Sequence, residues 1–535
     1  MAIGGNAGRT HVGRVLPGLK ATAASLAVFL VTALVGTGAA HAATRENSSP
    51  QHGGTLTALE TASFAGAWPV GLDPATNTSD AADQPYMDAI YGTLFEEGSA
   101  GKIIPDLATG YSISSNAMTV TIDLRKNVMF SDGTPFNAEA VDYNITQDLL
   151  PQYANIADPF FPVASISTTN DYTVVLHLSK PFQPIIDAFP GEAPNWIASP
   201  TAIQKMGIKQ FALTPVGAGP FKVVSDTPNA ELVVQKNPTY WEKGKPYLNE
   251  IDFKVVGNDN SALDALQTGG GDMVQYFGTP SLISSAKSKV NVETVPPSAP
   301  LDLQLNTSIP PFNNAQARQA IYYATDQNGI SKALSYGSGV VTQSPSGPGS
   351  VVYMKTVPGY RTFNINKAKQ LVQQMGGLSF TFDNVGLGAS ALVGQALVAD
   401  FRRAGMNVTV DNLNTLQAIL EAFSSNKWQT IVQGVGGVNP AVGAGSFGWR
   451  YLSSGPFTGV HDPTLDNMIN EATGTTDVSQ QYSDFKKIFS YISDHAYTPL
   501  IYAGPLWTLS VHTAHGPGVD TNLPAPYWED AWVSS

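Results

Sequence analysis

The chain has 535 residues, of which 43% are hydrophobic and 13% charged, with 29 Lys and Arg side chains against 42 Asp and Glu. It is too long for one ordinary domain, and its composition is that of a folded globular protein rather than of a disordered segment or a coiled coil. The formal net charge of −13 argues against nucleic acid as a partner. The absence of cysteine excludes disulfides, thiolate metal ligands, thiol catalysis and a lipid-modified N-terminal cysteine.

Residues 1–42 have the pattern of an export signal. Three basic residues and no acid are combined with an apolar run from Ala21 to Val35 and an Ala40-His41-Ala42 end, which fits the signal peptidase rule. We expect a cleaved signal peptide, a flexible N-terminus over 43–52, and a periplasmic or secreted protein without a lipid anchor. An uncleaved membrane anchor is the alternative, because the run approaches spanning length.

The N-terminal third predicts strands alternating with short helices. A strand over 54–59 and a helix over 87–97 precede the most informative passage, residues 119–144. This passage begins with a strand whose apolar residues alternate, continues through a turn at 131–135, and ends in a helix for which Asn137 is placed as the N-cap.

The C-terminal half predicts layered helices and strands. Helices are expected over 315–324, 367–375 and 392–404, and strands over 406–410 and 428–432. This alternation favours an α/β fold with parallel strands. Residues 497–511 are predicted to form strands that return to the first domain.

Three separate motifs carry a family resemblance. They are Leu124-Arg125 followed by Phe130-Ser131-Asp132-Gly133-Thr134-Pro135-Phe136, then Asn237-Pro238 with Tyr240-Trp241, and Ala265-Leu266-Gln267 before a glycine. Their order resembles that of the family 5 extracellular solute-binding proteins, the dipeptide, oligopeptide and nickel binders of ABC importers. The resemblance covers about residues 53–533 and implies an α/β, two-lobed type II periplasmic binding protein with an additional inserted small domain.

The same resemblance implies a domain division and a function. We expect lobe one over 53–89, 215–300 and 501–535, the inserted domain over 90–214, and lobe two over 301–500. The implied function is that of a monomeric ABC importer component that closes around a small peptide-like or oligosaccharide-like ligand and delivers it to permease subunits. A ligand sensor for a chemoreceptor or kinase is an alternative with the same fold, and a secreted hydrolase is a weaker one.

The motif search favours a binding protein over an enzyme. The sequence contains no G-x-S-x-G, no H-E-x-x-H and no phosphate-binding loop. Gly443, Gly445 and Gly448 match G-x-G-x-x-G, but no predicted strand leads directly into them, so we interpret the match as chance. We expect no catalytic residues, no cofactor and no metal.

Candidate ligand-binding residues come from turn-rich segments and from the resemblance. Aromatic side chains in such segments supply flat apolar surfaces to a cleft, although core packing is the alternative for each of them. Arg450 is a candidate for anionic groups, and the resemblance places Asn306 near the hinge between the lobes. The predicted set is Trp68, Asn306, Asn439, Phe447, Trp449, Arg450, Tyr451 and Trp507.

The loop after the strand at 430–432 bears on the ligand class. Peptide-binding relatives hold the ligand's ammonium group with an aspartate there, whereas residues 433–440 of this chain contain no acid. We therefore predict a ligand other than an ordinary peptide with a free amino terminus, such as a sugar or an amine-blocked peptide. An acid from elsewhere, such as Asp302 or Asp462, would restore peptide binding.

Overall fold

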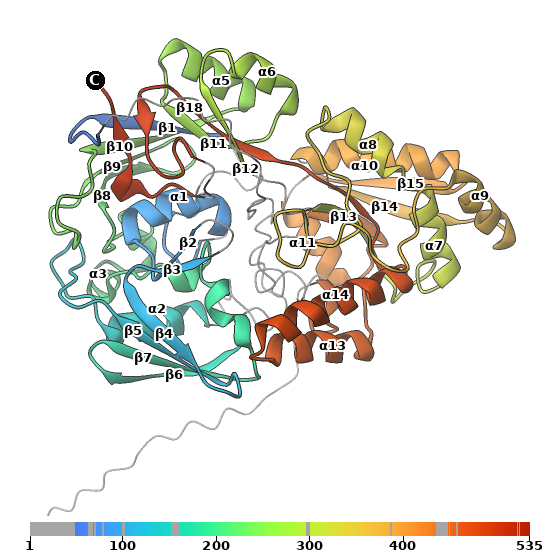
Figure 1. Cartoon of the computed structure of the whole chain (residues 1–535), viewed down its shortest axis with the longest axis horizontal. Helices are drawn as coiled ribbons and strands as arrows, with labels where there is room; N and C mark the ends of the chain where they lie inside the picture. The colour runs from blue at the N-terminus through green and yellow to red at the C-terminus, as the bar shows by residue number, and fades with distance from the viewer. Residues whose placement is uncertain are drawn as a thin grey trace, which may run out of the picture.

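The computed structural model describes residues 49–61, 68, 71–77, 80–98, 102–150, 161–295, 300–385, 388–414, 416–434, 448, 450–455, 458–521, 523 and 525–535. They form two bodies that lie side by side (Figure 1). Within these ranges, none of the helices combines the length and apolarity needed to cross a lipid bilayer.

A seven-stranded sheet forms the centre of the first body, which we call lobe one. Its strand order is β12-β18-β11-β1-β10-β9-β8, and β1 pairs in parallel with β10 and β11 while the other neighbours are antiparallel. The strands are β1 (Thr55–Thr61), β8 (Phe221–Thr227), β9 (Glu231–Lys236), β10 (Glu250–Val256), β11 (Met273–Phe277), β12 (Asn291–Val295) and β18 (Leu506–Ser510).

Helices cover both faces of this sheet because its strands are apolar on both sides. Leu56 and Ala58 of β1 share an apolar cluster with α1 (Asp80–Tyr91), whereas Leu59 shares another with α5 (Asp259–Thr268) and α6 (Ile283–Ala286). The helices α3 (Pro200–Met206) and α4 (Ile208–Phe211) also contribute Ala202 and Phe211 to the α1 cluster. That segment, expected in the inserted domain, thus packs on lobe one.

The inserted domain contains a four-stranded antiparallel sheet of order β4-β5-β7-β6. Its elements are β4 (Ala108–Ile113), β5 (Thr119–Leu124), β6 (Val163–Asn170), β7 (Thr173–Leu178) and α2 (Ala138–Asp148), and the hairpin β2 (Phe95–Glu97) with β3 (Ile103–Pro105) precedes them. The predicted strand, turn and capped helix are confirmed. The Asn137 side chain accepts a hydrogen bond from the Ala140 N–H at 3.0 Å, and Gly133 supplies the turn with a φ of 84°.

The second body, lobe two, is built on a five-stranded sheet of order β15-β14-β16-β13-β17. The strands are β13 (Pro300–Leu305), β14 (Ser379–Val385), β15 (Asn407–Leu413), β16 (Thr430–Gly434) and β17 (Leu500–Ala503). The helices are α7 (Ala315–Ala324), α8 (Gln327–Leu334), α9 (Ile365–Gln374), α10 (Gly388–Arg403), α11 (Leu416–Ser425), α13 (Pro463–Gly474) and α14 (Val478–Asp494).

The predicted α/β layering of lobe two is confirmed, but only some of its strand pairs are parallel. The strand β14 runs parallel to β15 and β16, whereas β13 is antiparallel to β16 and β17. The reason is the route of the chain, because β13 carries it away from lobe one and β17 carries it back.

Two chain crossings connect the lobes (Figure 1). The first lies between β12 and β13, and the second between β17 and β18. Because Ala503 still pairs with Pro300, the return to lobe one begins at Gly504, three residues after the predicted boundary. The crossings lie next to each other, since β13 pairs with β17 and β12 pairs with β18.

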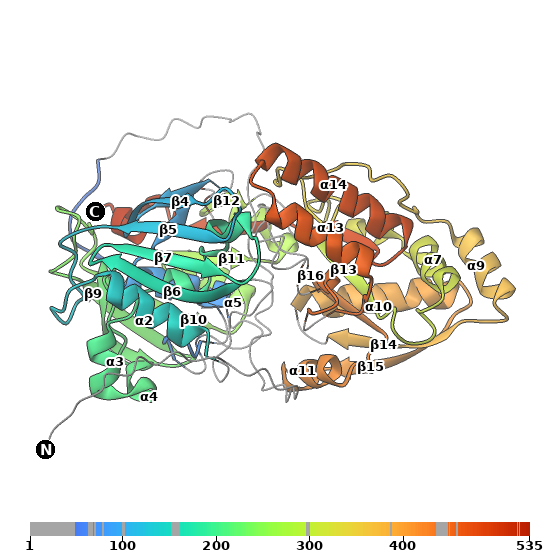
Figure 2. The same cartoon turned by 90° about the horizontal axis from the view of Figure 1, so that it is seen from below.

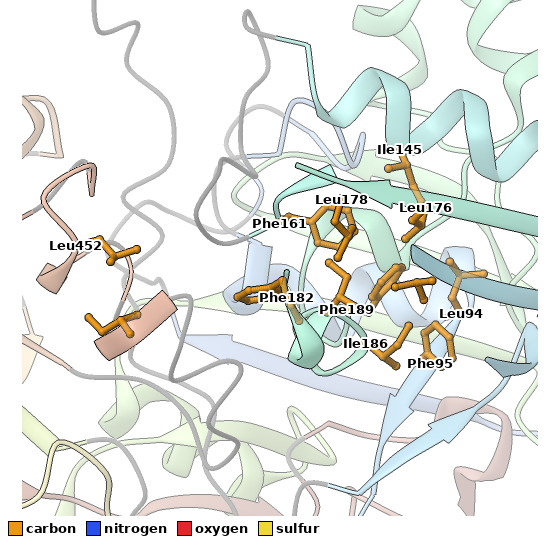
Figure 3. Packing of buried hydrophobic residues seen from close by; sticks show 14 of the residues in the cluster. Leu94, Phe95, Ile145, Phe161, Leu176, Leu178, Phe182, Ile186, Phe189 and Leu452 are labelled. Atoms are coloured by element: carbon orange, nitrogen blue, oxygen red, sulfur yellow. The ribbon is translucent and has the colours of Figure 1, made fainter. Parts of the chain in front are cut away.

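A large apolar cluster includes residues of the inserted domain and of lobe two. Figure 3 shows Phe161, Leu178, Phe182 and Phe189 packed in the inserted domain, with Leu452 on the opposite side. Figure 2 shows α13 and α14 on the side of lobe two that faces the inserted domain. A direct polar contact connects α14 with the inserted domain, because the Gln481 side chain donates a hydrogen bond to the Gln183 side chain at 3.1 Å.

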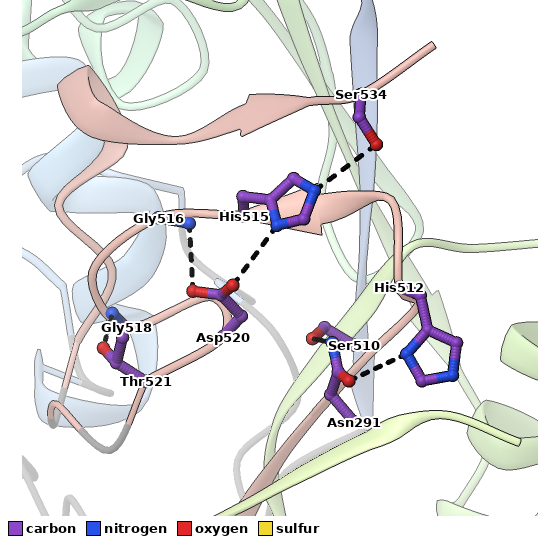
Figure 4. Close-up of polar contacts among 9 residues, drawn as sticks. All are labelled: Asn291, Ser510, His512, His515, Gly516, Gly518, Asp520, Thr521 and Ser534. Carbon is purple, nitrogen blue, oxygen red and sulfur yellow. Dashed lines mark hydrogen bonds and ion pairs between the residues drawn. The ribbon is translucent and has the colours of Figure 1, made fainter. Parts of the chain in front are cut away.

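The C-terminal segment packs on lobe one and is held there by polar contacts (Figure 4). The strands β19 (Ala514–His515) and β20 (Trp532–Val533) pair with each other. His515 lies 3.3 Å from the Asp520 carboxylate, and Asp520 also accepts a hydrogen bond from the Gly516 N–H. His512 contacts Asn291 of β12 at 2.8 Å. The C-terminal segment is therefore part of lobe one.

Candidate functional site

The strand ends next to the two crossings define the candidate site. On the side of lobe one, β1 and β11 end there and β18 begins there, since β18 follows a crossing and is antiparallel to β11. On the side of lobe two, β13 begins there and its partner β16 ends there, with Asp302 opposite Gln433. In open α/β sheets, ligands bind where strand ends and their loops meet.

Buried carboxyl groups lie at the end of β1. Glu60 is 8% exposed, and burial together with the neighbouring Asp83 raises the pKa of Glu60 well above its usual range. Asp83 accepts hydrogen bonds from the Asn77 side chain at 2.8 Å and from the Trp68 N–H at 3.2 Å. Burial still raises the pKa of Asp83 to about 7. These carboxyl groups contribute to the packing of lobe one, because their hydrogen-bond partners belong to the same lobe.

The two predicted tryptophans of lobe one are packed into it. Trp68 is fully buried, its indole N–H donates to Asp226 at 2.7 Å, and its ring lies edge-on to Tyr86 with centroids 4.4 Å apart. Trp507 is 4% exposed and belongs to the apolar cluster beneath α5 and α6. Core packing, the alternative for each aromatic, describes both residues in this conformation, and their contact with a ligand stays a prediction.

Asn306 has a structural role in lobe two. Its amide donates to the Trp428 carbonyl at 2.9 Å and to the Asn426 side chain at 3.1 Å, and its oxygen accepts from the Ser308 N–H. It follows the end of β13 that is remote from the crossing. These contacts explain the residue without a ligand, and its predicted place near the hinge was wrong.

The remaining predicted residues lie around the segment that follows β16. Asn439, Phe447 and Trp449 fall outside the described residues. Tyr451 is fully buried within lobe two. Arg450 is 6% exposed, and burial lowers the pKa of its guanidinium while the nearby Asp302 raises it. The structure thus brings together Arg450, Tyr451 and the start of β13.

Two residues of β13 lie outside the predicted set of ligand contacts, although Asp302 was named as an acid that would restore peptide binding. Asp302 and Gln304 are 0% and 4% exposed, and they alternate with Leu301, Leu303 and Leu305, which belong to the same apolar cluster as residues of α7 and α10. The alternation was visible in the sequence, but it is also the pattern of a strand with one side in water. Only the tertiary structure shows that both faces are covered.

A second polar cluster surrounds a cavity of about 30 Å³ between lobe one and the inserted domain. Its lining includes Asp88, Glu96, Asp106, Tyr240 and Glu529. Among the residues that the structure describes, no group of three or more His, Cys, Asp or Glu side chains has an arrangement that could hold a metal ion. The cavity has room for a water molecule, and the carboxyl groups around it bear on the stability of the fold.

Comparison with known proteins identifies the family. The family model described as "Bacterial extracellular solute-binding proteins, family 5 Middle" matches residues 102–457. The chain belongs to this family. The predicted membership is therefore confirmed, and the family is one of binding proteins rather than enzymes.

Curated relatives and solved structures agree with this membership. The glutathione-binding protein GsiB of Salmonella choleraesuis (strain SC-B67) is 29% identical over 313 residues, which cover 57% of this chain and 59% of that relative. The chain thus matches about three fifths of the relative's length. GsiB of Escherichia coli (strain K12) is 28% identical over the same length.

The solved structures show the fold. The binding protein DppA from Helicobacter pylori, in complex with the peptide STSA, has a TM-score of 0.76 at 19% identity and covers 91% of this chain and 99% of its own. AgaA from A. tumefacien R10, in complex with agropinic acid, has a TM-score of 0.74 at 22% identity and covers 90% and 99%. The predicted two-lobed α/β fold is confirmed.

Proposed function

We propose that this chain is the extracytoplasmic solute-binding component of an ABC importer. It would capture a small peptide-like or oligosaccharide-like ligand between its lobes and deliver it to membrane permease subunits, acting as a monomer in the periplasm or as a secreted protein. The observation that carries the proposal is the pair of adjacent crossings between two sheet-centred lobes in a member of the family 5 solute-binding proteins.

The physical mechanism is hinge closure. Because the crossings lie side by side, a rotation about them changes few backbone angles and leaves both sheets intact. A ligand that contacts both lobes has a higher affinity for the closed state than for the open state. Binding therefore increases the population of the closed state, to an extent set by the ratio of the two affinities. A permease can then distinguish the loaded protein from the empty one by shape.

The names of similar proteins support a small polar ligand. The GsiB relatives are named for glutathione, one structural neighbour is in complex with the dipeptide Met-Leu, and another is in complex with agropinic acid. These compounds combine peptide-like or carboxylate groups with small size. The export signal predicted over 1–42 lies outside the described residues, and export remains part of the proposal.

Calorimetry and small-angle X-ray scattering on the same samples test this function. The panel is glutathione, Met-Leu, its N-acetylated form and maltotriose. At least one compound should bind at micromolar concentration or below and reduce the radius of gyration of the protein. Saturation with a bound compound without a change in the radius of gyration would refute hinge closure. The same measurement with the permease present would show whether the closed form is the one that binds to the permease.

A further inference from the structure

The inserted domain meets lobe two through a short 3₁₀ helix, η2 (Gln183–Ala188). η2 contacts α13 directly, and the Gln481 side chain of α14 donates a hydrogen bond to the Gln183 side chain at 3.1 Å. Just before η2, Pro181 lies against the end of α13, because a Cβ at Gly474 would be 3.2 Å from the Pro181 Cβ. We call these four residues the distal contact, because they lie away from the crossings.

Lobe two itself holds Gln481 in position for this contact. The Gln481 side chain is 3% exposed, and its amide nitrogen also donates to the Ala472 carbonyl of α13 at 3.2 Å. An amide nitrogen carries two N–H groups, so one bond fixes the side chain on lobe two and the other is available to Gln183. The inserted domain therefore meets a donor whose orientation is already set, and less side-chain entropy is lost when the contact forms.

Other groups of the two bodies lie close together around the same contact. Tyr482 follows Gln481 on α14, and burial together with the charge of Asp187 on η2 raises the pKa of the Tyr482 hydroxyl. Phe182 of the inserted domain and Phe485 of α14 belong to one apolar cluster. Figure 3 shows Phe182 on the side of the inserted domain that faces lobe two. The amide pair is thus surrounded by further groups from both bodies.

The route of the chain makes the distal contact separable. The inserted domain is covalently joined to lobe one alone, and lobe two is joined to lobe one by the two crossings. The crossings lie above α13 and α14 in Figure 1, so a rotation about the crossings moves these helices toward η2 or away from it. Contacts between domains of one chain open readily unless they are large and hydrophobic. The two amides at the centre of this contact can bond to water when it separates.

We propose that the distal contact is a latch, which stabilises the closed arrangement of the lobes through protein groups alone. Because every group in it belongs to the chain, the closed state gains this free energy whether or not a ligand is bound. The closed state is therefore populated before binding, and a ligand selects it. The inference rests on the proposed function, because it assigns part of the free energy of closure to the inserted domain. Such a latch raises the affinity for every ligand by the same factor, since it changes the closed population and not the ligand contacts.

Disulfide trapping tests whether the latch forms without a ligand. The chain has no cysteine, so Pro181→Cys with Gly474→Cys introduces one pair. The 3.2 Å between the two Cβ positions is near the separation of about 3.5–4.5 Å found in disulfides. We expect copper phenanthroline to oxidise this pair to a disulfide with no compound of the panel present, which changes the mobility of the protein on a non-reducing gel. The cross-linked protein should have the radius of gyration of the ligand-saturated wild type.

Pro181→Cys with Asn467→Cys is the matched control. Asn467 is exposed on α13 and lies two helical turns, about 10 Å, before Gly474. If lobe two moved freely past the inserted domain, both pairs would react at similar rates. The latch predicts that the Gly474 pair reacts about 10-fold faster or more, because only that pair is held at the distance of a disulfide.

Gln183→Ala tests the latch without cysteines. This substitution removes the hydrogen bond from Gln481 and leaves the bond from Gln481 to Ala472 in place. We expect a larger radius of gyration without added compound, and an affinity weakened about 3- to 10-fold by one common factor for each compound of the panel that binds the wild type. Gln480→Ala is the control and should change neither quantity, because Gln480 is exposed and donates to Asp484 of its own helix.

The outcomes separate the latch from the proposed function. A disulfide that forms only after a binding compound is added would overturn the latch and leave the function standing, because closure would then depend on the ligand. Equal reaction rates of the two cysteine pairs would overturn the latch, as would a Gln183→Ala protein with unchanged radius and affinity, or with factors that differ between compounds. If no compound of the panel binds the wild type, the proposed ligand class fails, whereas the cross-linking rates still decide whether the latch exists.

Discussion

Raising the pH from 5 to 8 should destabilise the folded protein, because carboxyl groups are crowded around the cavity between lobe one and the inserted domain. Burial raises the pKa of Asp88 and of Asp106 to about 7, and burial with the nearby Asp106 raises that of Glu529 to about 8. In the unfolded chain these groups ionise near pH 4. The native state therefore keeps protons that the unfolded state has lost. The resulting stabilisation is complete below about pH 4 and disappears as the pH rises through 7 to 8.

The size of the effect can be worked for Asp88. A shift from 3.8 to about 7 is about 3 units, and at about 1.4 kcal/mol per unit this gives an upper limit of about 4 kcal/mol for this group. Asp88→Asn removes the ionisation and keeps an oxygen that can accept from the Trp196 indole N–H, now bonded at 2.7 Å. We expect the melting temperature of D88N to fall less steeply with pH than that of the wild type.

Differential scanning calorimetry at pH 5, 6, 7 and 8 makes the comparison. The control is Asp264→Asn, which changes an exposed aspartate on α5 and should follow the wild type. A wild-type melting temperature that rises between pH 5 and pH 8, or parallel pH profiles for D88N and the wild type, would refute the reasoning.

Three further substitutions test the packing of the fold. Trp507→Ala should lower the free energy of unfolding by about 3–5 kcal/mol, measured by denaturant titration, because it empties a buried site; lost affinity with unchanged stability would instead place the indole in the ligand site. Asn195→Ala should lower the free energy of unfolding by about 2 kcal/mol in the same assay, since the side chain makes two hydrogen bonds of 2.9 Å to the backbone of Phe95. A decrease of less than about 0.5 kcal/mol would contradict this expectation. Gly217→Ala should reduce the yield of folded protein, judged by circular dichroism, because its Cβ would collide with the backbone of Ile90; normal folding and stability would show that the turn can shift.

Local sequence signals predicted the elements whose causes are local. Asn137 and Gly133 act within a few residues, through a cap and a turn, so the strand, turn and helix around them could be read directly. The family motifs carried the order of the elements and hence the two lobes. The exact point of return to lobe one was missed, because Ala503 is held by its pairing with a strand some 200 residues earlier.

The polar sites could not be read in the same way. Asp88, Asp106 and Glu529 come from three distant parts of the chain and meet only because the C-terminal segment packs beside α1. Asp302 and Gln304 look like residues on the solvent side of a strand until helices are placed over both faces. Hydrophobic periodicity reports that a strand has two different faces, but it does not say what covers the polar one.

The contact between the inserted domain and lobe two offers a way to change the hinge without touching the ligand site. A Cβ at Gly474, the last residue of α13, would lie 3.2 Å from the Pro181 side chain of the inserted domain. A leucine side chain at this position needs more space than the gap between α13 and Pro181 provides. Rotation of the lobes about the crossings, toward the open form, would widen this gap. Gly474→Leu should therefore favour the open form. Leucine is also a better helix former than glycine, so the substitution should leave α13 intact.

The predicted result for Gly474→Leu is a larger radius of gyration of the ligand-free protein and an affinity reduced by the same population shift, about 10-fold if closure becomes about 1.4 kcal/mol harder. The melting temperature should stay the same. Asn470→Leu, an exposed change on the same helix, serves as the control and should alter neither quantity. If Gly474→Leu leaves the radius of gyration and the affinity unchanged, the contact between α13 and the inserted domain is compliant, and closure of the lobes is limited elsewhere.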